Sequence, residues 1–245
     1  MDNTTIVSAL MTNVNDRSDA NMDAYIRFGK LLLSSNIYKV VFIDEFIINQ
    51  FLDNVNERTI LIPINKNENY LYKYKHLITN YQLKTNSSKD TVEYMFTMCN
   101  KTEWVNQAIL LNTFNTSHFV WVDFGIKYVY GDTSCSFVSQ IEKFKYTNFN
   151  KIRIGTVWGI DKEYTNYDLY QTIVWYFGGG VFGGDTGSLK KFAILMKDKC
   201  IQIIQNDHTI MWEVNIWYMI YKENKELFDV YKCEHDKTML LNYLT

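Results

Sequence analysis

The sequence has few of the residues that define several whole classes of protein. Proline occurs once in 245 residues, at Pro63. The four cysteines, Cys99, Cys135, Cys200 and Cys233, are scattered, with neither a CxxC pair nor the spacing of a metal site. This distribution argues against a zinc-binding or disulfide-stapled fold and favours reduced, structural thiols in a cytoplasm. No internal repeat or interdomain linker is visible.

The sequence also lacks an excess of basic charge. The formal net charge is -2, and no basic block interleaved with aromatic residues occurs anywhere in the chain. Proteins that hold nucleic acid by neutralising its phosphates need such a block. The composition therefore predicts no nucleic-acid partner.

Long apolar runs are absent as well. The longest, at residues 39–48 and 172–184, fall short of the roughly 20 residues that a membrane span requires. The N-terminus, Met-Asp-Asn-Thr-Thr, has no basic region, and the first apolar run, Ile6 to Met11, is too short for a signal peptide. We therefore expect a cytoplasmic protein with no membrane span.

What the chain does have is material for one large core. Hydrophobic residues make up 47% of the sequence and aromatic residues 16%, which suits a single α/β domain over residues 1–245. In the first half, apolar runs predict strands at 4–11, 39–43, 58–64 and 119–122. Helical spacing predicts helices from Met22 onward, over 45–54 and over 91–111, and a helix with a loop within 67–89. Alternating strands and helices with short links imply a doubly wound, mostly parallel sheet flanked by helices.

The second half is less regular. Strands are predicted at 152–158 and 172–176, and helices at 188–205 and 209–222. Between them, residues 176–188 hold six of the eleven glycines. A glycine-rich loop that opens a helix can cradle a phosphate, although neither GxGxxG nor the P-loop pattern is present. The glycines equally suit a bulge or a close contact with another strand.

A single carboxylate ends the fourth predicted strand. The stretch Ser117 to Tyr128 runs through Phe119 to Val122 and stops on Asp123, with Gly125 two residues later. Open α/β sheets bind ligands at the carboxyl ends of their strands, so Asp123 is a candidate functional acid. The alternative is a turn-forming aspartate that only caps the strand.

Several segments in this order resemble the HtrL/YibB family of bacterial proteins and, through them, the GT-A glycosyltransferases. The segments are Thr5 to Ala9, Arg17, Glu93-Tyr94 leading to Lys101 and Val105, Trp121 to Ile126, Gly179 to Gly184, and a late acid before Glu226 to Phe228. The Gly-Gly-Val-Phe-Gly-Gly stretch is also similar to that of the blood-group type (family 6) transferases. In that family, an acid on the following helix lies beside the anomeric carbon, and Glu213 is the matching position.

The resemblance implies a transferase that moves a sugar from a nucleotide sugar to a carbohydrate or other hydroxyl acceptor. Residues of about 1–128 would bind the nucleotide, and residues of about 129–245 would shape the sugar and acceptor side. Glu213 would be catalytic. The expected donor contacts are Ser8, Arg17, Asp44, Lys101, Asp123, Gly180, Phe182, Gly183 and Gly184.

The resemblance also implies a Mn²⁺ or Mg²⁺ ion, with one departure from the usual pattern. Metal-dependent GT-A enzymes carry two acids in a DxD motif, whereas this chain has Asp123-Phe124-Gly125. Asp123 is the expected metal-side carboxylate, and His235 and Asp236 are the candidates for a C-terminal partner. The diphosphate and water would supply further oxygen ligands.

Two other functions fit the same residues. One is a phosphohydrolase or nucleotidyltransferase that uses Asp123 and Asp44 at strand ends. The other is a non-catalytic sugar-binding protein, which the missing second acid favours. Trp158, Trp175 and Trp217 would stack on sugars in either sugar-related function, or pack in the core.

Overall fold

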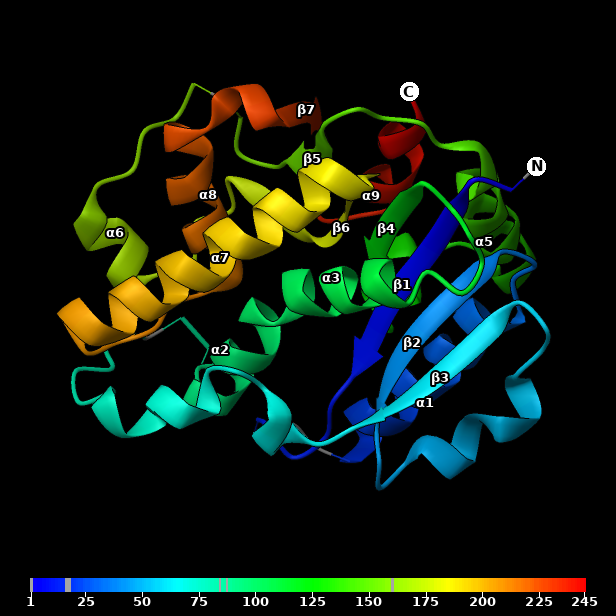
Figure 1. The fold of residues 1–245 in the computed structure, drawn as a ribbon, viewed down its shortest axis with the longest axis horizontal. Coiled ribbons are helices and arrows are strands. Elements are labelled where there is room, and N and C mark those ends of the chain that lie inside the picture. Colours follow the sequence, from blue (N-terminus) through cyan, green and yellow to red (C-terminus); the bar gives the residue numbers. More distant parts are fainter. Residues whose placement is uncertain (1, 16–18, 84, 87, 160) are drawn as a thin grey trace.

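The structure is a computed structural model, and it describes residues 2–15, 19–83, 85–86, 88–159 and 161–245. Its centre is one seven-stranded sheet, shown in Figure 1, with the order β3-β2-β1-β4-β6-β5-β7. The strands are β1 (Thr4–Leu10), β2 (Tyr38–Asp44), β3 (Thr59–Ile64), β4 (His118–Val122), β5 (Ile152–Thr156), β6 (Phe177–Asp185) and β7 (Phe228–Lys232). Strands β3, β2, β1 and β4 are parallel to one another, β6 is antiparallel to both β4 and β5, and β7 is parallel to β5. The predicted α/β domain with a mostly parallel sheet is confirmed.

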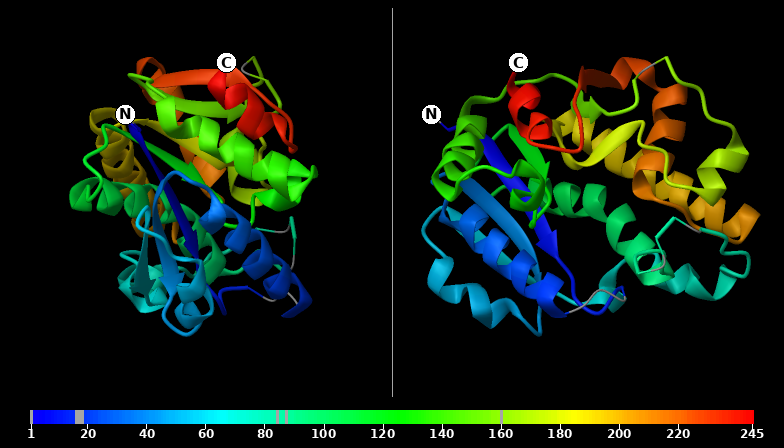
Figure 2. Two further views of the ribbon diagram at one scale, coloured as in Figure 1. Left: turned by 90° about the vertical axis from the view of Figure 1, so that its right-hand side faces the viewer. Right: turned by 180° about the vertical axis from the view of Figure 1, so that it is seen from behind.

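Helices cover both faces of the sheet. In Figure 1, α3 and α7 lie in front of the strands, and the view from behind in Figure 2 shows α1 on the other face. The helices are α1 (Asp19–Ser34), α2 (Val92–Cys99), α3 (Lys101–Leu111), α4 (Lys127–Tyr130), α5 (Ser134–Glu142), α6 (Asn166–Gln171), α7 (Thr186–Asp207), α8 (Glu213–Glu223) and α9 (Thr238–Leu241). Short 3₁₀ helices lie at Ile48–Asn54, Lys66–Glu68, Tyr72–Leu77, Lys143–Tyr146, Lys225–Leu227 and Asn242–Leu244. Among the described residues, no helix has both the length and the apolarity to cross a bilayer.

Alternating side chains of the central strands supply two separate cores. Phe119 and Trp121 of β4 belong to the cluster beneath α3, α7 and α8. Val120 and Val122 belong to the cluster on the other face, with residues of α1 and α5. Because successive strand residues point to opposite faces, a strand buried on both sides reads as a continuous apolar run. This is why the sequence predicts β4 well.

From the sequence, the glycine-rich segment is a candidate loop that opens a helix, but most of it forms strand β6. Its glycines allow close contact with the neighbouring strands. A Cβ added to Gly183 would lie 2.6 Å from the carbonyl oxygen of Phe119, and one added to Gly184 would lie 2.6 Å from that of Lys151. The close-contact alternative raised from the sequence therefore holds for this half of the segment.

Three other element predictions need correction. Residues 172–176, predicted as a strand, form an irregular approach to β6, and the predicted helix over 45–54 is a 3₁₀ helix at Ile48–Asn54. The predicted helix over 91–111 is broken at Asn100, which separates α2 from α3. The break makes Lys101 the first residue of α3, and this position bears directly on the site.

A buried histidine in this fold gives a testable pH dependence. His118, the first residue of β4, is 1% exposed, and burial lowers its pKa to about 4. The unfolded chain, with a histidine pKa of about 6.5, then binds more protons than the folded chain between these values. Stability is therefore complete above about pH 6.5 and is lost as the pH falls toward 4.

We expect this histidine to remove about 2 kcal/mol from the free energy of unfolding between pH 7 and pH 5. Urea denaturation at the two pH values would measure it as the part of the pH dependence that disappears in His118→Phe. The matched control is His76→Gln, at an exposed histidine on the Tyr72–Leu77 helix. Equal pH dependence in the wild type and in His118→Phe would contradict the prediction.

Candidate active site

Asp123 lies at the point in the parallel part of the sheet where the strand order reverses. Strand β1 pairs with β2 on one side and β4 on the other, which makes the β1–β4 boundary a topological switch point. Asp123 directly follows β4, and its backbone N–H donates to the carbonyl oxygen of Gly180 on β6 at 2.9 Å. Its side chain is 38% exposed. The predicted functional acid therefore lies at the carboxyl edge of the sheet and is accessible.

A buried lysine organises the surroundings of Asp123. The Lys101 ammonium lies 3.0 Å from Asp123 Oδ1, 2.9 Å from Glu213 Oε1 and 2.9 Å from the carbonyl oxygen of Gly179. Three oxygens match the three protons that an ammonium can donate. We call Lys101, Asp123 and Glu213 the charge cluster. It joins α3, the end of β4, and α8.

The charge cluster keeps its lysine charged. Burial alone would lower the pKa of Lys101, but the two nearby carboxylates raise this pKa above its ordinary value. The three side chains together carry one net negative charge when both carboxylates are ionised. The cluster is thus a fixed anionic site with one accessible acid.

Trp121 fixes the orientation of that accessible acid. Its indole Nε1–H donates to Asp123 Oδ1 at 2.7 Å, and Lys101 Nζ lies 5.8 Å from the centre of its ring. The ring stacks in turn between Trp104 and Phe182, at centroid distances of 6.0 and 6.3 Å. Asp123 Oδ1 is therefore held by one hydrogen bond and one ion pair, while Oδ2 faces the neighbourhood of Gly180.

Glu213, predicted to act at the sugar carbon, is covered. Its side chain is 4% exposed and its Oε1 is bound to Lys101. Its other oxygen, Oε2, is buried without a hydrogen-bond partner among the described residues. A Cβ on Gly179 would lie 2.6 Å from Oε1, so the absence of a side chain there makes room for the carboxylate. This arrangement positions Lys101 and leaves Asp123 as the accessible carboxylate.

The other predicted donor contacts are distributed differently. Ser8 is fully buried, and its hydroxyl donates to the carbonyl oxygen of Val122 at 2.6 Å. Asp44 is 4% exposed, and its carboxylate accepts from Thr12 and from the backbone N–H of Phe46. Both side chains brace strand ends and offer no free group to a ligand. Arg17 lies outside the described residues.

The glycine segment divides into two parts. Gly180 borders the site, because a Cβ there would lie 3.8 Å from Asp123 Oδ2. Phe182 is fully buried against Trp121 and Trp217, so its predicted donor contact is corrected to a core position. Gly183 and Gly184, as the fold shows, contact neighbouring backbone and do not reach Asp123.

The proposed metal ligands do not form a preformed site. Asp236 accepts from both the backbone and the hydroxyl of Thr238, and His235 packs edge-on against Trp175 at 4.0 Å. Within the described parts of the chain, no group of three or more His, Cys, Asp or Glu side chains converges as metal ligands do. Asp123 Oδ2 is a single oxygen, and a Mn²⁺ or Mg²⁺ ion needs several. The residues present therefore do not by themselves fit such an ion.

Sequence reasoning missed a cavity of about 180 Å³ beside the charge cluster. It lies between the segments that follow β1 and β3 and the adjoining ends of α2 and α3. One side chain on its wall, Asn100, carries a buried oxygen, Oδ1, without a hydrogen-bond partner in the described structure. The lining residues are Met11, Ile64, Asn65, Lys66, Glu68, Asn69, Tyr70, Thr97, Asn100, Glu103, Trp104 and Gln107. The only signal in the sequence was the polar run after the third strand.

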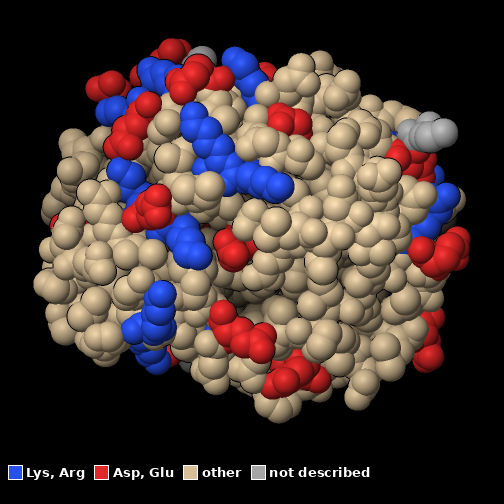
Figure 3. All heavy atoms as spheres, in the orientation of Figure 1, with Lys and Arg blue, Asp and Glu red and all other residues tan. Residues whose placement is uncertain are grey.

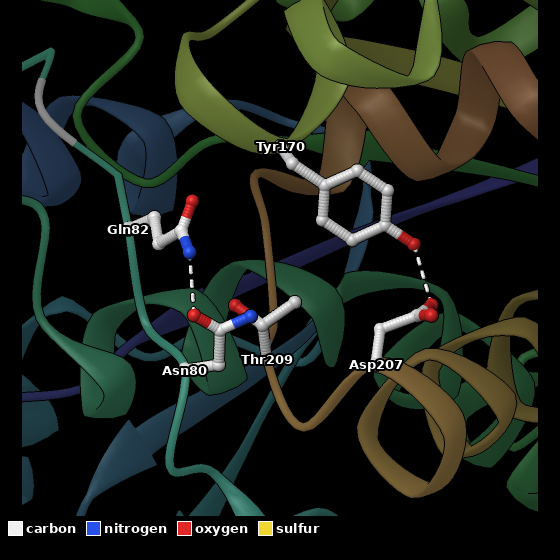
Figure 4. A pocket seen from close by; sticks show the side chains of 5 residues that line it. All are labelled: Asn80, Gln82, Tyr170, Asp207 and Thr209. Carbon is white, nitrogen blue, oxygen red and sulfur yellow. Dashed lines mark hydrogen bonds between the residues drawn. The ribbon is translucent and has the colours of Figure 1, made fainter.

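A second cavity, of about 290 Å³, lies between the segment at Asn80 and Gln82 and the segments at Tyr170 and at Asp207 to Thr209. Figure 4 shows its polar lining, in which the Tyr170 hydroxyl donates to Asp207 at 2.6 Å and Gln82 bonds to Asn80. Its residues pair mainly with one another. The cavity contains no member of the charge cluster.

The surface around these features is unevenly charged. On the face shown in Figure 3, lysine and arginine side chains gather over one half, and the other half carries few charges. No basic stripe crosses this face.

We expect the charge cluster to support the fold as well as the site. Lys101→Met would leave the buried Glu213 without its partner, and we predict a loss of about 3–5 kcal/mol in the free energy of unfolding. Urea denaturation would measure it. Lys199→Met is the matched control, because its partner Glu223 is 60% exposed and such a pair contributes at most about 1 kcal/mol. Similar losses in both variants would contradict the assigned role.

Comparisons with known proteins identify the family. No curated protein sequence gives a significant match. Among the solved structures that match, two are similar at 10% sequence identity, each over 94% of this chain. One is a glycosyltransferase involved in the glycosylation of the major capsid of PBCV-1, with a TM-score of 0.43 over 81% of its chain. The other is 4-diphosphocytidyl-2C-methyl-D-erythritol synthase from Anaerococcus prevotii, with a TM-score of 0.40 over 86% of its chain. The sequence model of HtrL_YibB, described as bacterial protein of unknown function, matches residues 5–239, and the chain therefore belongs to the HtrL_YibB family.

Proposed function

We propose that this protein is a GT-A-like glycosyltransferase that moves a sugar from a nucleotide-sugar donor to a hydroxyl acceptor. One observation carries the proposal. Asp123 is an accessible carboxylate at the switch point of the sheet, and Lys101 and Trp121 hold it in place. Ligands of open α/β sheets bind at this edge, and so fixed a carboxylate is suited to a reaction that needs an oriented charge.

The cavity beside α3 supplies a place for the nucleoside part of the donor. Asn100 lies on its wall and directly precedes Lys101 in the sequence. One residue of the cavity is therefore adjacent in the chain to one residue of the charge cluster. Asn100 Oδ1 is buried without a partner, and it would accept from a base N–H or a ribose hydroxyl if the side chain turned toward the cavity. A volume of about 180 Å³ suits part of a nucleotide better than a whole nucleotide sugar. The diphosphate and sugar would extend from it toward Asp123.

The transfer itself exchanges one bond for another. The bond between the anomeric carbon and the diphosphate oxygen breaks, and its electron pair leaves with the nucleoside diphosphate. The acceptor oxygen bonds to that carbon, and the proton of the acceptor hydroxyl passes to the departing diphosphate or to water. Asp123 Oδ2 is the accessible carboxylate oxygen at the reacting end. Glu213 acts as a positioning residue in this proposal, because its Oε1 holds Lys101, and Lys101 holds Asp123.

Dependence on Mn²⁺ or Mg²⁺ stays a prediction. Asp123 Oδ2 would be the one protein ligand, and the donor's phosphate oxygens and water would have to complete the coordination. When bound, such an ion would neutralise charge on the leaving diphosphate.

One alternative is disfavoured by the position of its second acid. A phosphohydrolase or nucleotidyltransferase using Asp123 together with Asp44 needs both carboxylates free, and Asp44 is buried with both oxygens bonded. A non-catalytic sugar-binding protein of the same fold would keep donor binding and show no transfer.

A thermal-shift assay with a panel of nucleotide sugars tests the proposal, with and without Mn²⁺. A donor at about 100 times its dissociation constant should add roughly 2.7 kcal/mol of stability to the wild type. Asp123→Asn should lower or abolish this gain. The matched control is Asp132→Asn, at an exposed acid paired with Lys237, which should leave the gain unchanged. If no donor stabilises the wild type in either condition, the proposal fails.

The role of Glu213 has its own test. We expect Glu213→Gln to keep donor binding and to reduce turnover by at least about tenfold, because a neutral amide holds Lys101 less strongly than a carboxylate does. Lys101→Arg should reduce turnover similarly if the effect passes through the lysine. A loss in Glu213→Gln with full activity in Lys101→Arg would instead place Glu213 at the sugar carbon. Unchanged turnover in Glu213→Gln would make it purely structural.

A further inference from the structure

We propose that Trp158 and Trp175 form a platform that binds a pyranose ring of a saccharide acceptor. The inference deepens the proposed function and rests on it, because it gives the acceptor a chemical class and a place. Of the three tryptophans that the sequence offered for sugar stacking, Trp217 is fully buried in the core. Trp158 is 45% exposed and Trp175 is partly exposed.

Backbone hydrogen bonds fix the two tryptophans beside each other. The N–H of Trp158 donates to the carbonyl oxygen of Trp175 at 3.0 Å, and the N–H of Val157 donates to that of Tyr176 at 3.0 Å. These bonds continue the pairing between β5 and β6 beyond the strand ends. The backbone at Trp158 and the backbone at Trp175 are therefore held side by side directly beyond the ends of β5 and β6.

The same pairing places the platform at the edge that carries Asp123. Strand β6 begins at Phe177, directly after Trp175 and Tyr176, and Gly180 accepts the hydrogen bond from the backbone of Asp123. Gly180 is five residue steps along the chain from Trp175, which at about 3.3 Å per step is roughly 17 Å. A di- or trisaccharide could span that length with one end at the charge cluster.

The surroundings of the rings suit a sugar. The axial C–H groups of a pyranose give it an apolar face that packs on an indole ring, and its hydroxyls project around the rim. Around Trp158, the Lys162 ammonium lies 4.6 Å from the ring centre, and the ring of Tyr164 lies 6.1 Å away. Beside Trp175, the imidazole of His235 packs edge-on at 4.0 Å. Lys162 lies over one face of the Trp158 ring and His235 packs against Trp175, so each indole has a hydrogen-bonding group in contact with it.

This placement also gives His235 a purpose other than metal binding. Four residues after it, Met239 lies against β6, with its sulfur 3.0 Å from the position of a Cβ on Gly178. The segment that carries His235 is therefore anchored next to the start of β6. The imidazole borders the platform and lies on the same side of the domain as the reacting edge.

Saccharide titrations followed through the indole N–H signals in NMR spectra test the inference. Lactose, maltose and cellobiose are the probes, each added separately to the full chain. The signals of Trp158 and Trp175 are assigned as those that disappear in Trp158→Phe and in Trp175→Phe. We expect at least one saccharide to shift these two signals. Trp158→Ala should weaken its binding by at least about tenfold. Tyr146→Ala is the matched control, at a 72% exposed aromatic ring next to the opposite end of the sheet, and should bind like the wild type.

The outcomes separate this inference from the proposed function. Unaltered saccharide binding in Trp158→Ala, or no binding of any of the three probes to the wild type, would overturn the platform. Stabilisation by the nucleotide sugar should be the same in Trp158→Ala and in the wild type, because neither tryptophan lines the proposed donor cavity. Saccharide binding at Trp158 without any donor binding would keep the platform and refute the transferase.

Discussion

The ion contacts of Lys101 are the interaction on which the rest of the site depends. A buried ammonium is costly unless every proton finds an oxygen, and here three oxygens lie within 3.0 Å. Those oxygens come from the end of β4, from β6 and from α8. The requirement to neutralise one charge therefore fixes the relative positions of three elements that are distant in sequence. The cavity on α3 and the exposed face of Asp123 both take their positions from this arrangement.

Much of the first half of the fold can be predicted from the sequence, because its strands are apolar runs of the right length. The predicted strands at 39–43 and 119–122 each lie one residue inside β2 and β4 at their N-terminal ends. β6 escapes such prediction, since glycine has low strand propensity and its place in the sheet is set by neighbours that need close approach. The break at Asn100 also escapes, because the apolar spacing of α2 and α3 continues across it.

For the site, sequence reasoning found the members but not their relations. Asp123, Lys101 and Glu213 were each predicted separately, and the structure brings them together, although Lys101 and Glu213 are 112 residues apart. Their assigned roles shifted, because a role depends on exposure: Glu213 is covered, and the protons of Lys101 are already shared. Ser8, Asp44 and Phe182 illustrate the same limit. A polar or aromatic residue near a strand end can face a ligand or its own framework, and only three-dimensional packing decides which.

Strand β6 carries no side chains from Gly178 to Gly180, and this limits how the range of substrates could be redesigned. Three successive positions beside the reacting edge carry no side chain, and a methyl group at Gly179 or Gly180 would collide with Glu213 or Ile126. The surface of β6 next to Asp123 is therefore made of main chain, and the carbonyl oxygens of Gly179 and Gly180 are already bonded to Lys101 and to the backbone of Asp123. Attempts to change the range of substrates would have little to mutate there. They should target the walls, namely the segments around Trp158 and around Asn65 to Asn69, where side chains can be exchanged without disturbing the buried charges.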